Sequence, residues 1–380
     1  MPGFGLKTAD SNAVRYYIYK SIDNPGIYEV RGSAATGDFT WNAQNFQGFY
    51  YDPDKDIGTE VLSAGLTEGI SLSGDSPYGL TYRTMAQAKS FKFSDWGQYN
   101  IIGFLGKGYF AGYAQESDSD PSQQILRINS KSPNLLNTDG LSEILFDDNR
   151  EQTVPKGSSL KLKQGYELLI KSVNQDGQAY LELLKDGKAI DSKILAPSAE
   201  GATMADKTYW YAKAFGSSNI VTLAVHLKNV YRDEDVAAAT VDGIWQISDQ
   251  FMPIKVGSQY GLMNVASYSA DSLTMDNKDH AIRLSRNKDI SIMPGLNIRV
   301  ADNDTLKYYP YTTVTVNEST VKSAPEGTGL QNEAPGIMPE AEKTSYSEGS
   351  QDNLTAANED KGITTGKQRE NTSKAIDPGI

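Results

Sequence analysis

The sequence predicts an all-β protein made of two β-sandwich domains followed by a disordered tail. Runs rich in Tyr, Val, Ile and Thr recur along the chain, and Gly, Asp and Ser separate them about every eight to twelve residues, as in β-sandwiches. The chain contains 22 tyrosines and 34 glycines, which suits strands and turns. Helical periodicity is sparse, although a short helix is compatible with residues 83–89 or 231–238.

Residues 1–26 are predicted to be the final strands of a preceding repeat. MPGFGLKTADSNAVRYYIY, which starts at Met1, aligns without a gap with MPGLNIRVADNDTLKYYPY, which starts at Met293. Met, Pro, Gly, Ala, Asp and three tyrosines are identical in the two phrases. The offset of 292 residues indicates an internal repeat with one full copy present, so Met1 is expected to be an internal residue of a longer protein.

Residues 27–157 are predicted to form the first β-sandwich domain. Strand patterns such as YEVRGSA and FQGFYYD dominate this segment. The phrase IIGFLGKGYFAGY predicts a hairpin that turns at Gly106, Lys107 and Gly108.

Residues 158–314 are predicted to form the second β-sandwich domain. Its clearest local pattern is GYELLIKSVNQDGQAYLELLKDGKAIDSKI, in which three β runs are separated by Asp176-Gly177 and Asp186-Gly187. Asp-Gly pairs favour tight hairpin turns, so this stretch predicts a meander. The boundary between the two domains is soft, and a strand that crosses it would make one domain discontinuous.

Residues 315–380 are predicted to be a disordered tether. This segment is rich in Glu, Ser, Thr, Gly, Pro and Asn, and Tyr346 is its one aromatic residue. It cannot bury enough apolar surface to offset the entropy lost on ordering.

The charge and composition exclude several classes of protein. The net charge of −12 argues against nucleic-acid partners and against binding to an anionic membrane surface. The absence of cysteine excludes disulfides, thiolate metal sites and cysteine catalysis. No run of eighteen apolar residues and no signal peptide is visible in the sequence.

One acidic turn has the spacing of a calcium loop. DPDKDIGTE places Asp52, Asp54 and Asp56 at alternate positions, but Ile57 and Ser63 stand where an EF-hand needs Gly and Glu. The alternative is a solvated acidic turn. We predict a weak Ca²⁺ or Mg²⁺ site at these three aspartates, serving structure or bridging subunits, and no catalytic cofactor.

Asn-x-Ser/Thr sequons cluster toward the C-terminal end of the chain. They begin at Asn303, Asn317, Asn353 and Asn371, and residues 1–302 contain none. Such sequons accept N-linked glycans in exported proteins, although each also arises by chance. We therefore predict N-linked glycans as partners at these asparagines if the protein is exported.

The sequence gives little support to catalysis. Neighbouring carboxylates, such as Asp147 and Asp148 or the group Asp233, Glu234 and Asp235, could serve a glycosidase only if two lay about 5 Å apart in a cleft. Acidic turns are common throughout the chain, so the plainer interpretation is solvated surface. No catalytic residue is predicted.

Several long phrases resemble the tandem-duplicated S-layer domain family of Methanosarcina-type archaea. They include YEVRGSAATGDFTWNAQNFQGFYYD, SDWGQYNIIGFLGKGYFAGY, VDGIWQISD and ISIMPGLNIRVADNDTLKYYPY, and the resemblance covers roughly residues 1–314. It implies two tandem copies of a module, each with two β-sandwiches, then a glycosylated tether and a membrane anchor. This chain departs from that pattern at both ends, because the signal peptide, most of the first copy and the anchor helix are not in it.

The resemblance implies a structural function. We expect copies of the chain to assemble with one another into a porous lattice at the cell surface, with acidic pore walls and with membrane attachment only through the anchor. The alternative from another class is a secreted carbohydrate-binding or carbohydrate-active β-sandwich protein. An enzyme would place two carboxylates in one groove among aromatic rings, and a binding module would expose a flat row of Trp or Tyr.

Overall fold

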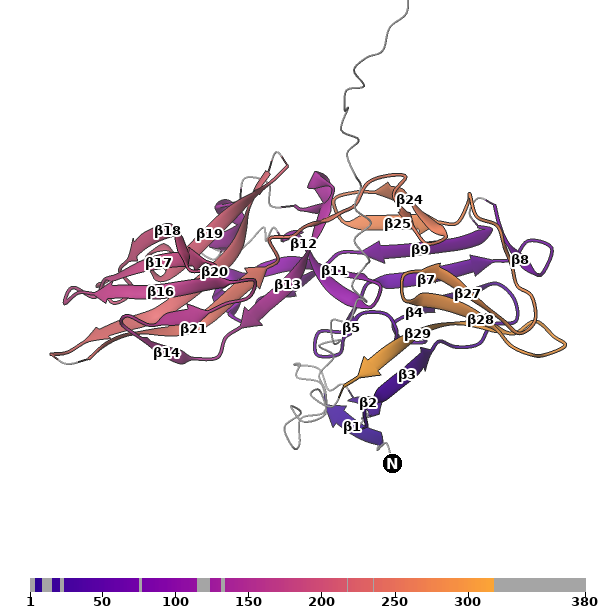
Figure 1. The fold of residues 1–380 in the computed structure, drawn as a ribbon, viewed down its shortest axis with the longest axis horizontal. Helices are drawn as coiled ribbons and strands as arrows, with labels where there is room; N and C mark the ends of the chain where they lie inside the picture. The colour runs from indigo at the N-terminus through magenta and orange to yellow at the C-terminus, as the bar shows by residue number, and fades with distance from the viewer. Residues whose placement is uncertain are drawn as a thin grey trace, which may run out of the picture. The chain divides into compact units, whose positions relative to one another are not determined.

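The computed structural model describes residues 4–8, 16–20, 24–74, 77–114, 124–130, 134–216, 218–234 and 236–317. Strands dominate this part of the chain, as Figure 1 shows, and the all-β prediction is confirmed. The helical segments within it are α1 (Ile125–Ile128), α2 (Met204–Lys207), η1 (Ser94–Trp96) and η3 (Leu136–Thr138). No helix in the described ranges is long and apolar enough to cross a membrane.

The two helices considered from sequence are wrong. Residues 83–89 lie in β9 (Gly79–Met85) and β10 (Gln87–Ser90), and residues 231–238 lie where β20 (Ser218–Arg232) turns into β21 (Ala237–Ile247). Both segments take part in antiparallel ladders, in which Arg83 lies opposite Thr274 and Tyr231 lies opposite Ala238. Strand pairing, long-range for the first segment and within a hairpin for the second, therefore overrides their weak helical tendency.

The repeated phrases fold into the same hairpin. β1 (Phe4–Thr8) pairs with β2 (Tyr16–Lys20), and Lys7 lies opposite Tyr17. β28 (Leu296–Val300) pairs with β29 (Tyr308–Val316), and Arg299 lies opposite Tyr309. These partners differ by 292 residues on each strand, so the internal repeat keeps its strand register as well as its sequence.

Two sheets built from both ends of the described chain enclose the first core. One has six strands, in the order β23 (Gln259–Tyr260), β24 (Met263–Tyr268), β25 (Ser272–Asp276), β9, β7 (Glu60–Gly65) and β4 (Phe39–Asn42). The other has four, in the order β27 (Lys288–Met293), β28, β29 and β3 (Gly26–Arg31). Trp41, Leu62 and Tyr82 of the first sheet and Ile298 and Tyr308 of the second belong to one buried cluster. The two sheets therefore pack as the layers of a sandwich.

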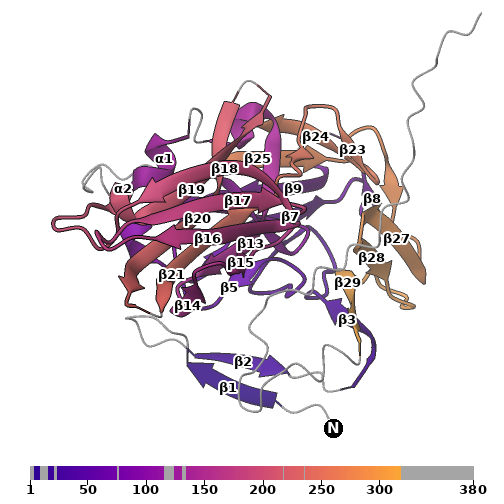
Figure 2. The same ribbon diagram turned by 60° about the vertical axis from the view of Figure 1, so that its left-hand side comes forward.

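Two further sheets enclose the second core. The predicted meander forms a sheet in the order β15 (Ser159–Lys161), β16 (Tyr166–Val173), β17 (Ala179–Lys185) and β18 (Lys188–Leu195), and it lies over part of a nine-stranded sheet (Figure 2). Leu168 and Leu181 from the meander pack with Val225 and Val241 from the larger sheet. The nine-stranded sheet has the order β10, β11 (Gln98–Phe104), β12 (Lys107–Tyr113), β13 (Gly140–Asp148), β21, β20 and β19 (Thr208–Phe215), with β14 (Gln152–Pro155) on β21 and β22 (Met252–Pro253) on β13.

The predicted turns have local causes that the structure shows. Asp186 and Gly187 both have positive φ, 49° and 78°, which is the geometry of a two-residue hairpin turn. The hairpin of β11 and β12 also forms, but its turn is at Leu105 and Gly106 (φ 52° and 81°), slightly before the predicted position. Two small sheets complete the fold: β5 (Tyr51–Asp52) with β6 (Ile57–Gly58), and β8 (Ser71–Leu72) with β26 (Ile282–Arg283).

A third buried cluster, rich in aromatic rings, lies along the nine-stranded sheet. Trp245 packs edge-on against Phe91, with ring centroids 4.8 Å apart, and also contacts Tyr99 and Phe110. The Trp245 indole N–H donates to the Tyr113 hydroxyl over 3.0 Å. This cluster joins the β10–β12 strands to β20 and β21 within one continuous interior.

The pairing of β3 with β29 joins segments about 285 residues apart in the chain. A division into residues 27–157 and 158–314 remains a proposal, and the strand pairing supports the version in which one domain is discontinuous. β29 ends at Val316, so the first two residues of the predicted tether, 315 and 316, belong to this strand. The rest of the predicted tether, residues 318–380, lies outside the described residues.

Candidate functional site

The predicted cation loop is an acidic turn with its own internal partners. The Asp52 Oδ1 atom accepts hydrogen bonds from the backbone N–H groups of Asp54 and Lys55, over 3.0 and 3.2 Å. Its Oδ2 atom lies 2.8 Å from the Nζ atom of Lys89. Asp56, at φ 57°, accepts a 2.7 Å hydrogen bond from Tyr51. Lys89 thus supplies a positive charge at the position where a cation was predicted.

Within the described ranges, no group of three or more His, Asp or Glu side chains has the spacing to hold a metal ion. The Ca²⁺ or Mg²⁺ site at Asp52, Asp54 and Asp56 stays a prediction. The charge of Asp52 is paired with that of Lys89.

Two of the four sequon asparagines lie in the described residues, and both are exposed. Asn303 lies in the loop before β29, and its Oδ1 atom accepts from the backbone N–H and the hydroxyl of Thr305, over 3.0 and 3.1 Å. This fold places the two chemically required residues of the sequon, Asn and Thr, in direct contact. Asn317 follows the last residue of β29. Asn353 and Asn371 lie outside the described residues.

The carboxylate pairs considered for catalysis are engaged in local structure. Asp147 accepts from the Lys92 backbone N–H over 2.9 Å, whereas its neighbour Asp148 binds Arg150. Adjacent residues of a strand point to opposite faces, so these two carboxylates cannot flank one substrate. Asp233 accepts from the Glu234 backbone N–H, and Asp235 lies outside the described residues.

The tryptophans do not form an exposed sugar-binding row. Trp41, Trp96 and Trp245 are buried in the cores. A polar depression of about 410 Å³ is lined by turns that contain Asp176, Glu200 and Arg232, but Tyr231 is the one aromatic residue in its lining. The Arg232 guanidinium donates to the Val173 carbonyl, and the Tyr231 hydroxyl donates to the Asp233 carboxylate, so both groups already have partners within the protein.

A buried carboxylate that the sequence analysis missed lies between the six-stranded sheet and the β11–β12 hairpin. Glu60 is 1% exposed. Its Oε2 atom accepts from the Tyr50 backbone N–H over 2.6 Å, its Oε1 atom accepts from the Tyr82 hydroxyl over 2.7 Å, and both lie 3.1 Å from the Gly106 N atom. We call Glu60 and these three donors the Glu60 centre.

Close packing around the Glu60 centre depends on a glycine. A Cβ atom at Gly103 would lie 2.6 Å from the Thr59 hydroxyl oxygen and 2.8 Å from the Glu60 carboxylate. The Gly103 N–H donates to Thr59 over 2.6 Å, and the Thr84 hydroxyl donates to the Gly103 carbonyl over 2.7 Å. Burial raises the pKa of Glu60 to about 7, although the hydrogen bonds from Tyr50 and Tyr82 act in the opposite direction.

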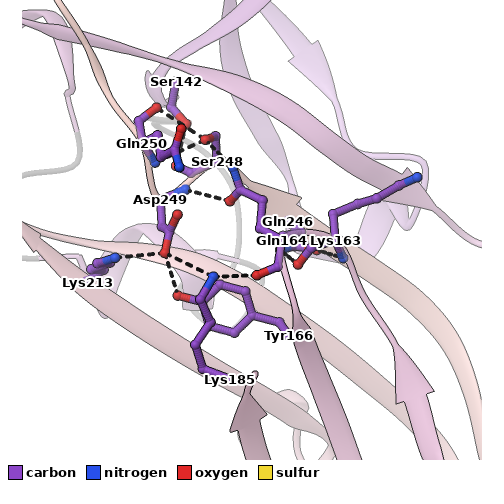
Figure 3. A network of polar contacts seen from close by, with 10 residues as sticks. All are labelled: Ser142, Lys163, Gln164, Tyr166, Lys185, Lys213, Gln246, Ser248, Asp249 and Gln250. Atoms are coloured by element: carbon purple, nitrogen blue, oxygen red, sulfur yellow. Dashed lines mark hydrogen bonds and ion pairs between the residues drawn. The ribbon is translucent and has the colours of Figure 1, made fainter. Parts of the chain in front are cut away.

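A second polar network joins the four-stranded sheet to the nine-stranded sheet (Figure 3). The Asp249 Oδ2 atom lies 2.9 Å from the Tyr166 hydroxyl, 2.7 Å from Lys213 Nζ and 3.7 Å from Lys185 Nζ. Burial alone would raise the pKa of Asp249, but the hydrogen bonds from Lys213 and Tyr166 outweigh it and hold that pKa below its ordinary value. We call this group the Asp249 network.

Amide side chains extend the Asp249 network along the interface. Gln246 is 1% exposed, accepts from the Lys163 backbone N–H over 2.9 Å and donates to the Lys163 carbonyl over 3.0 Å. Gln164 donates to the Ser248 hydroxyl and accepts from the Asp249 backbone N–H. These bonds fix the β15–β16 turn against the end of β21 and do not line a substrate cleft.

One sequence signal could have found Glu60. It shares its strand face with Leu62 and Ala64, which are buried, so a charged residue stands in an apolar alternation. Asp249 gives no comparable signal in the sequence. It lies after β21, and the two lysines close to it, Lys185 and Lys213, belong to other strands.

Comparison with known proteins identifies one family. A family model described as S-layer protein matches residues 31–302. The chain is 32% identical to the major S-layer protein of Methanosarcina barkeri (strain Fusaro / DSM 804), covering 86% of this chain and 47% of that protein. It is 30% identical to the major S-layer protein of Methanosarcina mazei, covering 84% and 45% of the two chains. The chain thus spans about half the length of the curated relatives that it matches.

Proposed function

The chain belongs to the S-layer protein family, and from this premise we propose that it is a structural subunit that assembles with copies of itself into a two-dimensional porous lattice on the archaeal cell surface. The observation that carries the proposal is the family match over residues 31–302, which includes most of the described strands. A lattice needs a rigid module with contact surfaces repeated by symmetry, and it needs no catalytic cleft.

The internal chemistry of the module supports a structural function. The Glu60 centre and the Asp249 network both use their polar groups to fasten one sheet to another. Buried networks with satisfied hydrogen bonds rigidify a fold, which suits a subunit of a layer under mechanical stress. With a net charge of −12, the subunit would give the pores negative walls that disfavour the passage of anions.

We further propose N-linked glycans at Asn303, Asn317, Asn353 and Asn371, and attachment of the lattice to the membrane through an anchor segment. Asn303 and Asn317 are exposed, which supports modification at these two positions. Divalent cations such as Ca²⁺ or Mg²⁺ would relieve repulsion between acidic subunits, with Asp52, Asp54 and Asp56 as a weak site.

Electron microscopy of the purified chain, concentrated on a lipid surface, tests the proposed lattice. The expected result is an ordered array with a regular pore spacing. A chelator at constant ionic strength should reduce the order of the array if cations bridge the subunits. A chain that forms no ordered array at any concentration, but binds or cleaves polysaccharide, would support the carbohydrate-active alternative instead.

A further inference from the structure

The internal repeat locates the joint between one copy of the module and the next. β29 ends at Val316, and carrying the offset of 292 residues to this position places its counterpart at Asn24. β3, the first strand of the module, begins at Gly26. Pro25 is therefore the one residue between the last strand of a preceding copy and the first strand of this one. The curated relatives are about twice as long as the segment they share with this chain, which leaves room in them for a second copy.

A joint of one residue brings two successive copies into contact. An extended residue spans at most about 3.6 Å, so Asn24 and Gly26 lie within about 7 Å of each other. Packed sheets lie about 10 Å apart, so the facing ends of the two copies must touch near the joint. The ring of Pro25 also fixes its own φ angle and restricts the backbone of Asn24 before it. The joint therefore has few bonds that can rotate freely.

Tyr28 holds the joint against β3. Its hydroxyl donates to the Asn24 carbonyl over 2.9 Å, and this bond spans Pro25. A Cβ atom at Gly26 would lie 3.4 Å from the Tyr28 ring. Gly26 itself has φ 157°, which residues with a side chain rarely adopt, so the start of the strand depends on glycine. These contacts give the joint a defined conformation, unlike that of a flexible linker.

Ile27 exposes an apolar side chain at this joint. It is 73% exposed, the largest value among the exposed large apolar side chains of the described chain. It lies opposite Thr315, where β3 pairs with β29, whereas β28 stops pairing with β29 at Tyr311. The end of the module is thus a two-stranded ribbon, and such ribbons are marginally stable without a packing partner. Ile27 stands two residues after Pro25, so a preceding copy would lie within its reach.

We propose that the ribbon end around Ile27 is the docking surface for the preceding copy of the module in the same polypeptide, and that Pro25 and Tyr28 hold the two copies at a fixed angle. The inference rests on the internal repeat and does not depend on the lattice. Chain continuity sets the occupant, because the joint holds the preceding copy within about 7 Å of Gly26. The acceptor is the end of the preceding copy's corresponding sheet, where its last strand leaves at Asn24.

Introduced cysteines test the proposal, because the chain has none of its own and a single thiol reports the exposure of one position. Placing residues 24–292 ahead of Met1 gives a tandem protein in which residues 1–24 complete the added copy. Ile27→Cys is then made either in the second copy, directly after the joint, or in the added copy, which has no module before it. The readout is the rate of reaction with a maleimide, with thermal unfolding to verify that each protein is folded.

We expect the thiol in the second copy to react about tenfold more slowly than the thiol in the added copy, because only the former is covered. Val256→Cys is the matched control: it replaces a side chain that is 65% exposed and should react equally fast in both copies. Gly-Ser-Gly-Ser inserted between Pro25 and Gly26 of the second copy should remove most of the difference, because a flexible linker releases the contact. Tyr28→Phe in the second copy should remove part of it.

Equal rates at Ile27 in the two copies overturn the docking surface, and they leave the lattice proposal intact because arrays are measured separately. A tandem that folds only with the insertion overturns it too, because a joint of one residue would then be incompatible with two folded copies. If the second-copy thiol stays slow in both the insertion variant and Tyr28→Phe, Pro25 and Tyr28 do not hold the two copies together, and that part of the proposal is wrong.

Discussion

Glu60 and Asp249 are both carboxylates that fasten a neighbouring sheet to the nine-stranded sheet, but different donors surround them. Glu60 accepts from two backbone N–H groups and a phenol, and within the described part of the chain none of these donors is a cation. Asp249 accepts from a phenol and lies close to two lysines. Complete burial raises the pKa of Glu60, whereas for Asp249 the hydrogen bonds from Lys213 and Tyr166 outweigh burial and lower the pKa. Neutral donors stabilise the charge of a carboxylate, but those around Glu60 do not offset its complete burial, whereas the donors around less buried Asp249 do.

Removing each carboxylate should give the largest difference between the two regions. Glu60→Ala leaves the buried donors of Tyr50, Tyr82 and Gly106 without their acceptor and opens a cavity, so we expect a loss of about 3–5 kcal/mol in the free energy of unfolding. Asp249→Ala should lose about 1–2 kcal/mol, because the side chains of Lys185 and Lys213 can reach solvent. Urea denaturation measures both, and an equal loss in the two variants would contradict the comparison.

The pH dependence of stability should separate the two regions next. The pKa of Glu60 is raised from 4.5 to about 7, so the folded state binds the proton more tightly than the unfolded state. The resulting stabilisation is fully present below pH 4.5 and is lost as the pH rises through about 7, a change of about 3 kcal/mol. Glu60→Gln should flatten this part of the stability curve, as measured by urea midpoints between pH 4 and pH 8.

The Asp249→Asn variant is the control for that measurement. Because the pKa of Asp249 is lowered, its contribution is present above the ordinary aspartate pKa of 3.8 and is lost at more acidic pH. In this variant the free energy of unfolding should still fall between pH 4.5 and pH 7, as in the wild type. Its dependence on pH should change only below about pH 4. If Asp249→Asn also abolished the pH dependence of stability between pH 4.5 and pH 7, that dependence could not be due to Glu60 alone.

The smallest expected effect distinguishes the two lysines of the Asp249 network. Lys213 Nζ is 2.7 Å from the carboxylate and Lys185 Nζ is 3.7 Å away. Lys213→Met should therefore destabilise the protein by about 1 kcal/mol near pH 7 and Lys185→Met by less, because coupling falls with distance. The thermal midpoints of the two variants give the comparison, and the reverse order would show that the shorter contact is not the stronger one.

Local chemistry predicted the strands and turns but not their long-range partners. Asp186-Gly187 specifies its hairpin because both positions need positive φ, which Gly adopts readily and Asp tolerates. The alternation of Leu168 and Ile170 specifies which face of β16 is buried. Nothing near β3 in the sequence indicates that Thr312 will lie opposite Val30, because that pairing depends on the assembled core.

The candidate sites were predictable only where function follows from a short motif. The Asn303 sequon was visible as letters, and the structure adds its exposure and its contact with Thr305. The Asp52 turn was also visible, but the paired cation comes from Lys89, which reaches it from β10. Sequence spacing within one loop cannot show which distant side chain will neutralise it.

The pairing of the first and last strands of the module, β3 and β29, has a mechanical consequence. Gly26 lies opposite Val316 in this antiparallel pair, so the chain enters and leaves the module at the same end of one sheet. Tension applied to the chain at these two points pulls the strands apart from one end. Their hydrogen bonds then break one after another and do not share the force at the same time. The sandwich cores lie outside the line of force until that pair has opened. A surface layer built from such modules would resist swelling of the cell mainly through sideways contacts between modules, and the covalent backbone would act as a compliant tether.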